Sequence, residues 1–287
     1  MSIRAILVPT EGGEEWLQVL EAALVVARRF ESHIAVLYVA ESTTKTGIYT
    51  SLSRDLKKSV RDEEKALLNQ NASEIEQQVD AFAKRKRIEL TDKPKSAARI
   101  SISFHFEIGN RNEILVHWAR LFDTTALMRP ARSSNLFRHY AKTDSLENVM
   151  LQSGRPLLMV PPNWKVHKAQ HAIVAWNHSL EASRAVAMTL PWLAQMKKVT
   201  VVVPKKRLKS GDQLVELLAW HGAKASVQTL NRRTSTVAKR LLKICDNEGA
   251  DFLVMGGYSH SRMQERVFGG VTDYVLSHSK IITVMVH

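Results

Sequence analysis

The residues best suited to bind a ligand form a glycine-rich stretch near the end of the chain. Only 12 of the 287 residues are glycine, and four of these fall within 256–270. The pair 256–257 follows the apolar run DFLVM, and the pair 269–270 opens a stretch with helical spacing. Glycine lets a backbone approach a ligand closely, and the free N–H groups of a helix's first turn favour phosphate. Arg262 and Arg266 can add charge-assisted hydrogen bonds, so the stretch predicts an anion site.

The spacing of these glycines matches neither of the two common phosphate-binding motifs. No G-x-x-x-x-G-K-S/T and no G-x-G-x-x-G occurs in the chain. The structural alternative is that the four glycines only form two turns. The strand–loop–helix order still places the stretch at the carboxyl end of a strand, where doubly wound folds bind ligands.

Histidines and hydroxyls nearby offer two other kinds of chemistry. His178, His260 and His278 fall near the glycine stretch by fold, but zinc needs three or four converging ligands and the sequence shows no such cluster. The run Asn177-His178-Ser179 lacks a nucleophile-elbow pattern and is interpreted as a helix start with Ser179 as its N-cap. No general base, metal-binding carboxylate pair or nucleophile is identified, so we expect no enzyme activity, with slow ATP hydrolysis left open.

Cysteine and tryptophan indicate structural roles. The single cysteine, Cys245, excludes an internal disulfide, suits a reducing compartment and is predicted to be a buried helix residue. Trp176, Trp192 and Trp220 are predicted to pack in the core and at its edges rather than to form a stacking platform.

The charge of the chain favours anionic partners. Lys and Arg number 41 against 28 Asp and Glu, a net charge of +13. Residues up to 162 hold 23 basic and 20 acidic side chains, whereas the remainder holds 18 and 8. The basic runs 205–209 and 232–243 carry no nucleic-acid recognition motif and are interpreted as solvated faces. The excess is therefore expected to form a positive field around a phosphate-sized site.

The elements that must position this site follow a repeated β-α-β pattern. Short aliphatic runs near 3–9 and 33–39 flank an amphipathic helix, and runs near 171–176 and 198–203 do the same. Each half offers five strands. The remaining six lie near 100–106, 124–129, 156–160, 224–228, 251–255 and 281–286. Strands alternating with helices predict an α/β fold of two tandem, doubly wound, five-stranded parallel sheets.

The two halves are predicted to pair about a pseudo-two-fold axis through their final strands, 156–160 and 281–286. The Pro-led polar segment 161–170 marks the boundary, which gives domains over 1–162 and 163–287. Whether two chains pair again as a homodimer stays open. The start of the chain has no signal-peptide pattern and no run long enough to cross a membrane, so a cytoplasmic protein is expected.

A long helical pattern over 51–90 distinguishes the first half. Its apolar stripe is broken and its other faces are densely charged, ending in Lys84-Arg85-Lys86-Arg87. The favoured interpretation is a solvated helix that covers one sheet edge. The alternative is an arm that binds a protein partner.

The string GGYSHSR…FGGVT, together with the two-copy organisation, resembles the universal stress protein family in a tandem two-domain form. Nucleotide-binding members of that family carry G-x2-G-x9-G-(S/T) between the fourth strand and the last helix. The resemblance covers essentially the whole chain, and its distinctive part is 253–286. It implies the adenine nucleotide alpha-hydrolase-like fold and an adenine nucleotide, ATP or AMP, with magnesium accompanying ATP.

The resemblance also implies a set of site residues in the second half. Ala175 and Asn177 correspond to the tip of the first strand, where the nucleoside is held, and Val203 lies beside the base. The phosphate and ribose loop comprises Met255, Gly256, Ser259, Arg262, Gly269, Gly270, Val271 and Thr272.

Three of these positions depart from the family pattern. Ser259 stands where the second glycine is expected, and its Cβ narrows the backbone approach. Gly270 replaces a hydroxyl residue, although Thr272 is near. Asn177 offers an amide where the family often has an acid.

The first half lacks the glycine loop altogether. Its corresponding stretch, 127–149, contains no glycine, although Glu11 and Gly109 keep other family positions. This half is therefore predicted to bind no nucleotide in the family manner. Arg129, Arg132 and Arg138 are interpreted as a solvated basic loop, with binding of another anion as the alternative.

The expected function is that of a stress-response regulatory protein that binds an adenine nucleotide in its C-terminal domain. The alternative is a stress-related interaction module that binds no nucleotide and recruits a protein through the helix 51–90. Nucleic acid is the less favoured partner, and no membrane association is expected.

Overall fold

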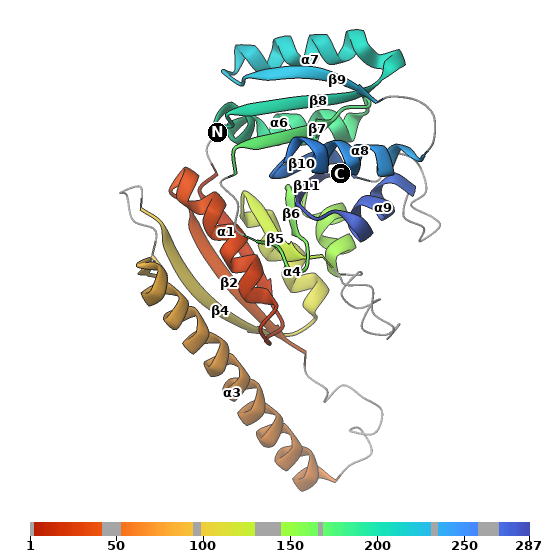
Figure 1. The fold of residues 1–287 in the computed structure, drawn as a ribbon. Helices are drawn as coiled ribbons and strands as arrows, with labels where there is room; N and C mark the ends of the chain where they lie inside the picture. The colour runs from red at the N-terminus through yellow and green to blue at the C-terminus, as the bar shows by residue number, and fades with distance from the viewer. Residues whose placement is uncertain are drawn as a thin grey trace.

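In the computed structural model, the described residues are 3–41, 53–93, 99–129, 145–165, 169–230, 235–257 and 270–287. Within them, eleven strands form one continuous sheet (Figure 1) in the order β3-β4-β2-β1-β5-β6-β11-β10-β7-β8-β9. The strands are β1 (Ala5–Thr10), β2 (His33–Ala40), β3 (Glu89–Leu90), β4 (Ser101–Ile108), β5 (Thr124–Met128), β6 (Leu157–Val160), β7 (His171–Ala175), β8 (Lys198–Pro204), β9 (Ala225–Leu230), β10 (Phe252–Gly256) and β11 (Ile282–Val286).

Every strand pair of this sheet is parallel except one. β6 and β11 pair antiparallel, with Val284 opposite Leu158, and this pair joins the two halves. On either side of the junction the order of equivalent strands is mirrored, since β5-β1-β2-β4 corresponds to β10-β7-β8-β9. The predicted tandem α/β fold, its ten strands and the pairing through the final strands are confirmed. β3 is the addition, because a two-residue strand carries no apolar run to reveal it.

Helices cover both faces of the sheet. One face is covered by α1 (Trp16–Phe30), α3 (Arg54–Lys86), α6 (Leu180–Ala194) and α7 (Leu208–Trp220), whose buried residues share a core with alternate strand residues such as Ile6 and Val8. The other is covered by α4 (Arg111–Leu121), a helix over 145–152, α8 (Val237–Glu248) and α9 (Gly270–His278), around Leu7 and its equivalents. A doubly wound sheet needs both layers because its strands are apolar on both sides.

The duplication extends to single capping residues. Asp123 accepts hydrogen bonds from the backbone N–H groups of Arg4 and Ala5, at 2.7 and 3.0 Å, at the start of β1. Asp251 accepts the equivalent pair from Gln170 and His171, at 2.7 and 2.9 Å, at the start of β7. Each carboxylate thus satisfies two backbone donors that begin a central strand.

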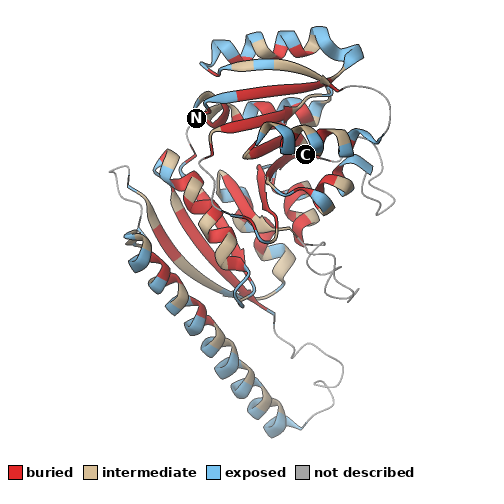
Figure 2. Cartoon of the chain, in the orientation of Figure 1, coloured by how far each residue is buried: buried red, intermediate tan, exposed pale blue. Residues whose placement is uncertain are grey.

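Helix α3 covers the sheet with only its second half. Buried residues occur from Ala72 onward, among them Ile75, Val79 and Phe82, whereas Leu56 and Leu67 are 54% and 57% exposed. Figure 2 shows the exposed first half of α3 extending past the sheet. The interpretation as a solvated edge-covering helix therefore fits residues 72–83. Leu68 still packs partly against the core, whereas Leu56 and Leu67 are left exposed.

One tryptophan prediction is wrong. Trp192 is 2% exposed and lies among Phe30 and Phe252, as a core residue should. Trp220, by contrast, is 83% exposed at the end of α7. α7 covers the outermost strands of the second half, and Trp220 lies at its end, where no further described element packs against the ring. Cys245 is 2% exposed, as predicted, and burial raises the pKa of its thiol to about 12.

Candidate functional site

The carboxyl edge of the second half brings together most of the predicted site residues that the structure describes. Met255 pairs with Ala175 in adjacent strands, and the chain beyond each strand leaves the sheet at this edge. β8 lies on the far side of β7, so Val203 ends the next strand along. Ser259, Arg262 and Gly269, with Arg266 and His260, lie outside the described residues.

The connection from β7 to α6 is a tightly bonded turn. Asn177 Oδ1 accepts a hydrogen bond from the Ser179 N–H at 3.0 Å, and Ser179 Oγ accepts one from Ala182 N–H at 3.2 Å. Ser179 is therefore the N-cap of α6, as predicted. The side-chain oxygen of Asn177 is engaged inside the turn, so only the NH2 group of this amide is left to donate to a ligand. Between them, His178 has a φ of +66°, a strained conformation for a residue other than glycine.

Gly256 is required by helix packing rather than by approach of a ligand. A Cβ at this position would lie 2.6 Å from Ala182 N and 2.7 Å from Glu181 C. The glycine allows the first turn of α6 to sit against the end of β10.

Gly257 meets the other half of the molecule. A Cβ there would lie 3.1 Å from the Sδ atom of Met150, in the helix over 145–152. Arg129 is the equivalent residue of the first half, and it contacts the second half in turn. Its Nη1 donates a hydrogen bond to the Leu276 carbonyl of α9 at 2.8 Å. Burial lowers the pKa of Arg129. This residue, interpreted from sequence as part of a solvated loop, therefore connects the two halves.

The first turn of α9 is open towards solvent. α9 begins at Gly270, where an added Cβ would meet no described atom within 4 Å. Val271 is 38% exposed, whereas Thr272 is only 6% exposed. Gly270 and Val271 can therefore present backbone N–H groups to an anion, and Thr272 is better placed for packing than for donating its hydroxyl.

Lys239 adds a positive charge beside this helix start that the sequence analysis did not assign to the site. Its Nζ lies 5.8 Å from the ring centroid of Tyr274, in the second turn of α9. The basic run 232–243 gave the signal, but its pattern could not show which element it faces. The packing of α8 against α9 places this ammonium group over the second turn of α9.

Val203 contributes no side chain to the site. It is fully buried, and its methyl groups lie against Gly211 of α7, where a Cβ would approach to 3.0 Å. Its backbone lies in the sheet, in register with Thr229 of β9.

The same edge of the first half is filled by its own side chains. Arg111 Nη2 forms an ion pair with Glu11 Oε1 at 2.7 Å, and the Arg111 N–H donates to Glu41 Oε1 at 3.2 Å. Glu11 follows β1, Glu41 follows β2 and Arg111 begins α4, so the contacts cross the edge where a ligand would lie. Arg132 and Arg138 lie outside the described residues.

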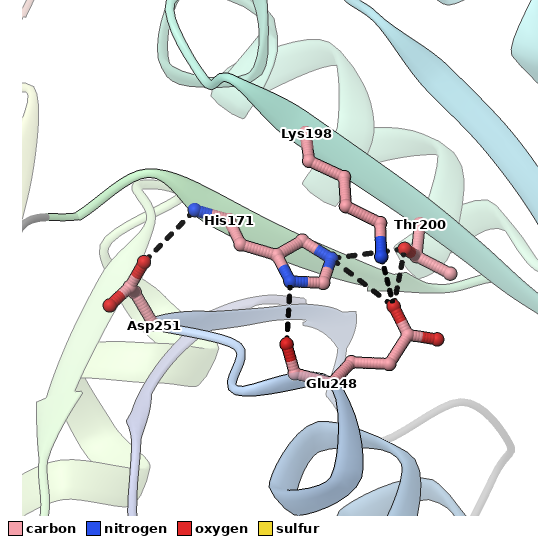
Figure 3. Close-up of polar contacts among 5 residues, drawn as sticks. All are labelled: His171, Lys198, Thr200, Glu248 and Asp251. Atoms are coloured by element: carbon pink, nitrogen blue, oxygen red, sulfur yellow. Dashed lines mark hydrogen bonds and ion pairs between the residues drawn. The ribbon is translucent and has the colours of Figure 1, made fainter.

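A polar network at the opposite, amino edge of the second half is structural (Figure 3). Glu248 Oε2 accepts hydrogen bonds from Lys198 Nζ at 2.8 Å and Thr200 Oγ1 at 3.0 Å, and His171 Nε2 lies 3.0 Å from Thr200 Oγ1. Burial opposes ionisation of Glu248, but the bonds from Lys198 and Thr200 outweigh it and lower its pKa. Burial, with Lys198 adding to it, lowers the pKa of His171. The network joins the amino ends of β7 and β8 to the end of α8, at the sheet edge opposite the candidate site.

Metal ligands do not converge in the described part of the chain, where no three His, Cys, Asp or Glu side chains are grouped to hold an ion. Of the histidines considered for zinc, His178 contacts Ser210 and His278 stacks on Tyr274 at 3.9 Å between ring centroids. Among the same residues, no helix has the length and apolar character needed to cross a membrane.

Comparison with known proteins gives one family. A model of the universal stress protein family matches residues 2–161 and 185–287. A crystal structure of a universal stress protein from Archaeoglobus fulgidus DSM 4304 is similar over 98% of this chain and 97% of its own, with 16% identity and a TM-score of 0.69. A putative universal stress protein from Pseudomonas aeruginosa UCBPP-PA14 is 13% identical over 99% of this chain and 93% of its own, with a TM-score of 0.54. No curated protein matches the sequence.

Proposed function

Because the chain belongs to the universal stress protein family, we propose that it acts by binding an adenine nucleotide in its second half. ATP, accompanied by magnesium, and AMP are the proposed ligands. Two observations support this: β10 and β7 end side by side at the carboxyl edge, and the first turn of α9 is exposed, with Lys239 over Tyr274 in the next turn. Backbone N–H groups and an ammonium group together favour phosphate.

The first half is proposed to bind no nucleotide, so the expected stoichiometry is one per chain. The Glu11–Arg111 ion pair at 2.7 Å crosses its carboxyl edge, whereas the second half has Asn177 in place of Glu11 and begins α8 with Val237 in place of Arg111. A regulatory role in the stress response, in the cytoplasm and without catalysis, is part of the proposal. ADP release from bound ATP is the assay for hydrolysis, and steady turnover would contradict a purely binding role.

Titration calorimetry with ATP and with AMP tests the proposal. The decisive variant is Gly270→Glu, because the added side chain has open space among the described residues and negative charge at a helix start favours the helix. It should fold normally and repel phosphate, so we expect at least about a tenfold loss of affinity, equivalent to about 1.4 kcal/mol.

A matched variant, His221→Glu, adds the same charge at the exposed end of α7, away from this edge, and should bind normally. Absence of binding by the wild type at millimolar nucleotide, or equal affinities for wild type and Gly270→Glu, would overturn the proposal.

A second candidate function rests on α3. Its first half presents Leu56 and Leu67, both more than half exposed, among charged neighbours, as an amphipathic recognition helix does. Recruitment of a protein partner through this surface is tested by Leu56→Asp with Leu67→Asp. Partners that co-purify with the wild type should be lost, while an unchanged partner set would eliminate this function.

A further inference from the structure

The outer strand of the second half, β9, has one side to which no described residue bonds. β9 pairs with β8 and ends the sheet (Figure 1). The Val199 N–H donates to the Lys224 carbonyl at 2.9 Å, and Val199 is in register with Ala225. Along a parallel strand, the N–H and C=O of one residue point to the same side, and that side alternates from residue to residue. The N–H and C=O groups of Ala225, Val227 and Thr229 therefore point outward.

This edge lacks the features that protect most sheet edges. The sequence of β9, ASVQTL, has no charged residue and no proline, and its register with β8 is continuous, without a bulge. The equivalent outer strand of the first half, β4, is paired with β3 at Ser101 and Ile102 and carries the exposed charge of Glu107. An unprotected, uncharged strand edge is a template for pairing with another strand.

Helix α7, which packs on β8 and β9, has an apolar flank above the same edge. Ser210 of α7 accepts a hydrogen bond from Trp176 Nε1 at 2.8 Å, at the end of β7, so the Ser210 flank faces the interior of the sheet. By helical spacing, Leu208 and Val215 lie on the opposite flank, which faces past β9. Leu208 is 43% exposed, and Val215 is partly buried.

Helix α8 has a similar flank on the other face of the sheet. Lys239 of α8 lies over Tyr274 of α9, the helix between β10 and β11. By helical spacing, Val237 and Ile244 lie on the flank away from α9, and Val237 is 40% exposed. A lone extended peptide can pair with β9 but cannot cover both helix flanks. A partner with helices on both faces of its own sheet can cover them.

A second copy of this chain is such a partner, and the edge is complementary to itself. When two copies of β9 pair antiparallel about Val227, Ala225 of one copy lies opposite Thr229 of the other. Each outward N–H of these residues then meets an outward C=O. Lys224 lies opposite Leu230, so the two Lys224 charges do not meet across the strands. The two halves of one chain are joined in the same way, by the antiparallel pair β6 and β11 within one sheet.

The helix flanks fit the same two-fold axis. A Cβ on Gly211 of α7 would lie 3.2 Å from Val227 Cγ1, so Gly211 lies over the residue on the axis. The rotation places the α7 helices of both copies on one face of the sheet. Leu208 and Val215 are nearly equidistant in sequence from Gly211, so Leu208 of one copy approaches Val215 of the other.

We propose that the outer edge of β9 is a homodimer interface. Two copies continue their sheets through antiparallel β9 strands, and the apolar flanks of α7 and of α8 cover the new strand pair on its two faces. The interface uses none of the residues proposed to bind a nucleotide, so the two proposals stand or fall independently.

Sedimentation equilibrium of the full chain measures its mass against protein concentration. The mass should rise from 32.4 kDa towards twice that value between about 1 μM and 1 mM. Each copy has a net charge of +13, so added salt should screen the repulsion and strengthen association. A mass that stays at 32.4 kDa at about 1 mM protein and about 0.5 M salt would overturn the proposal.

Leu208→Asp tests the helix flank. In the single chain the new carboxylate is exposed and lies in the first turn of α7, where negative charge favours the helix, so the variant should fold. In the dimer it would be buried against Val215 of the other copy, so association should weaken at least about tenfold.

The matched control is Leu217→Asp. Leu217 is 46% exposed on the same helix, but it lies on the Ser210 flank, so association should stay within about twofold. Equal weakening by both substitutions would overturn the proposal. Thr229→Pro tests the strand, because it removes one outward N–H at an edge position where proline is tolerated, and it should also prevent association.

Hydrogen exchange shows which surface associates in the unmodified protein. The outward amides of Ala225, Val227 and Thr229 should exchange more slowly at high than at low protein concentration, because only the dimer bonds them. A dimer that leaves these amides unprotected would use another surface and would overturn the proposal. Equal protection at every concentration in a 32.4-kDa species would show that another segment of the same chain covers the edge, which would overturn it as well.

Discussion

At the residue scale, two glycines of the candidate site, Gly256 and Gly270, have different physical roles. The backbone of α6 lies 2.6 Å from the position of a Cβ on Gly256, whereas Gly270 has no described atom within 4 Å. Gly256→Ala should therefore force α6 away from β10 and lower the free energy of unfolding by about 1–3 kcal/mol. Gly270→Ala should change it by less than about 0.5 kcal/mol or raise it. Urea unfolding of the two variants measures both, and equal losses would contradict the packing role of Gly256.

Two half-buried histidines in the first half make the free energy of unfolding depend on pH. His33 Nε2 and His105 Nε2 share the hydroxyl of Ser103, at 3.0 and 2.7 Å. Burial lowers the pKa of His33, with a further contribution from His105 and opposition from Asp92. Burial also lowers the pKa of His105 against the fields of Asp92 and Glu107. Both imidazoles are thus held neutral in the folded state.

Because these folded pKa values lie below those of the unfolded chain, the unfolded state takes up protons first as pH falls. The contribution of these histidines to the free energy of unfolding should therefore be complete above about pH 6.5, and the free energy of unfolding should decrease below that pH. His33→Gln should flatten part of this dependence, whereas His221→Gln, at an exposed position, should not. Urea unfolding between about pH 7.5 and pH 5.5 is the measurement, and a wild type equally stable across that range would contradict the prediction.

Local features of the site could be predicted from the sequence, and long-range ones could not. Ser179 as N-cap follows from neighbouring residues alone. The roles of Gly256 and Arg129 depend on Ala182 and Leu276, which belong to other elements. Lys239 was visible as charge, but only the packing of α8 on α9 shows what it faces.

At the element scale, the central strands were predictable because burial on both faces requires uninterrupted aliphatic runs. The outer strands β4 and β9 mix polar and apolar residues and are less buried. The exposure of individual helix residues could not be predicted, because an apolar stripe shows that one face of a helix packs but does not show where the neighbouring element ends. Trp220 and the first half of α3 illustrate this. Each continues an apolar pattern past the last described strand.

The two halves of α3 should respond differently to the same kind of change. Ile75→Ala removes a side chain that is 4% exposed and should cost about 2–4 kcal/mol. Leu67→Ala removes one that is 57% exposed and should cost less than about 0.5 kcal/mol. Urea unfolding compares the pair, and a large loss at Leu67 would show that the first half of α3 packs against another part of the molecule.

At the scale of the whole molecule, one sheet and a shared core join two copies of a single fold. Phe30 of α1 and Trp192 of α6 meet across the junction, with ring centroids 6.3 Å apart, and Arg29 Nη1 donates to the Ala169 carbonyl at 2.6 Å. The copies have diverged in their carboxyl edges rather than in their cores. One edge is crossed by the Glu11–Arg111 ion pair, whereas the corresponding position after β7 is Asn177, which is engaged in its own turn.

This junction predicts that the two halves unfold as one unit. Leu158 of β6 is fully buried and stands opposite Val284 of β11, which is also fully buried. Separating the halves would expose both strands, so neither half should open alone. Leu158→Ala should lower the free energy of unfolding by about 2–5 kcal/mol. Native-state hydrogen exchange should show this loss equally in the slowest amides of β1 and of β10, because both report the same global opening. A loss confined to the strands of the first half would instead show two independently stable domains.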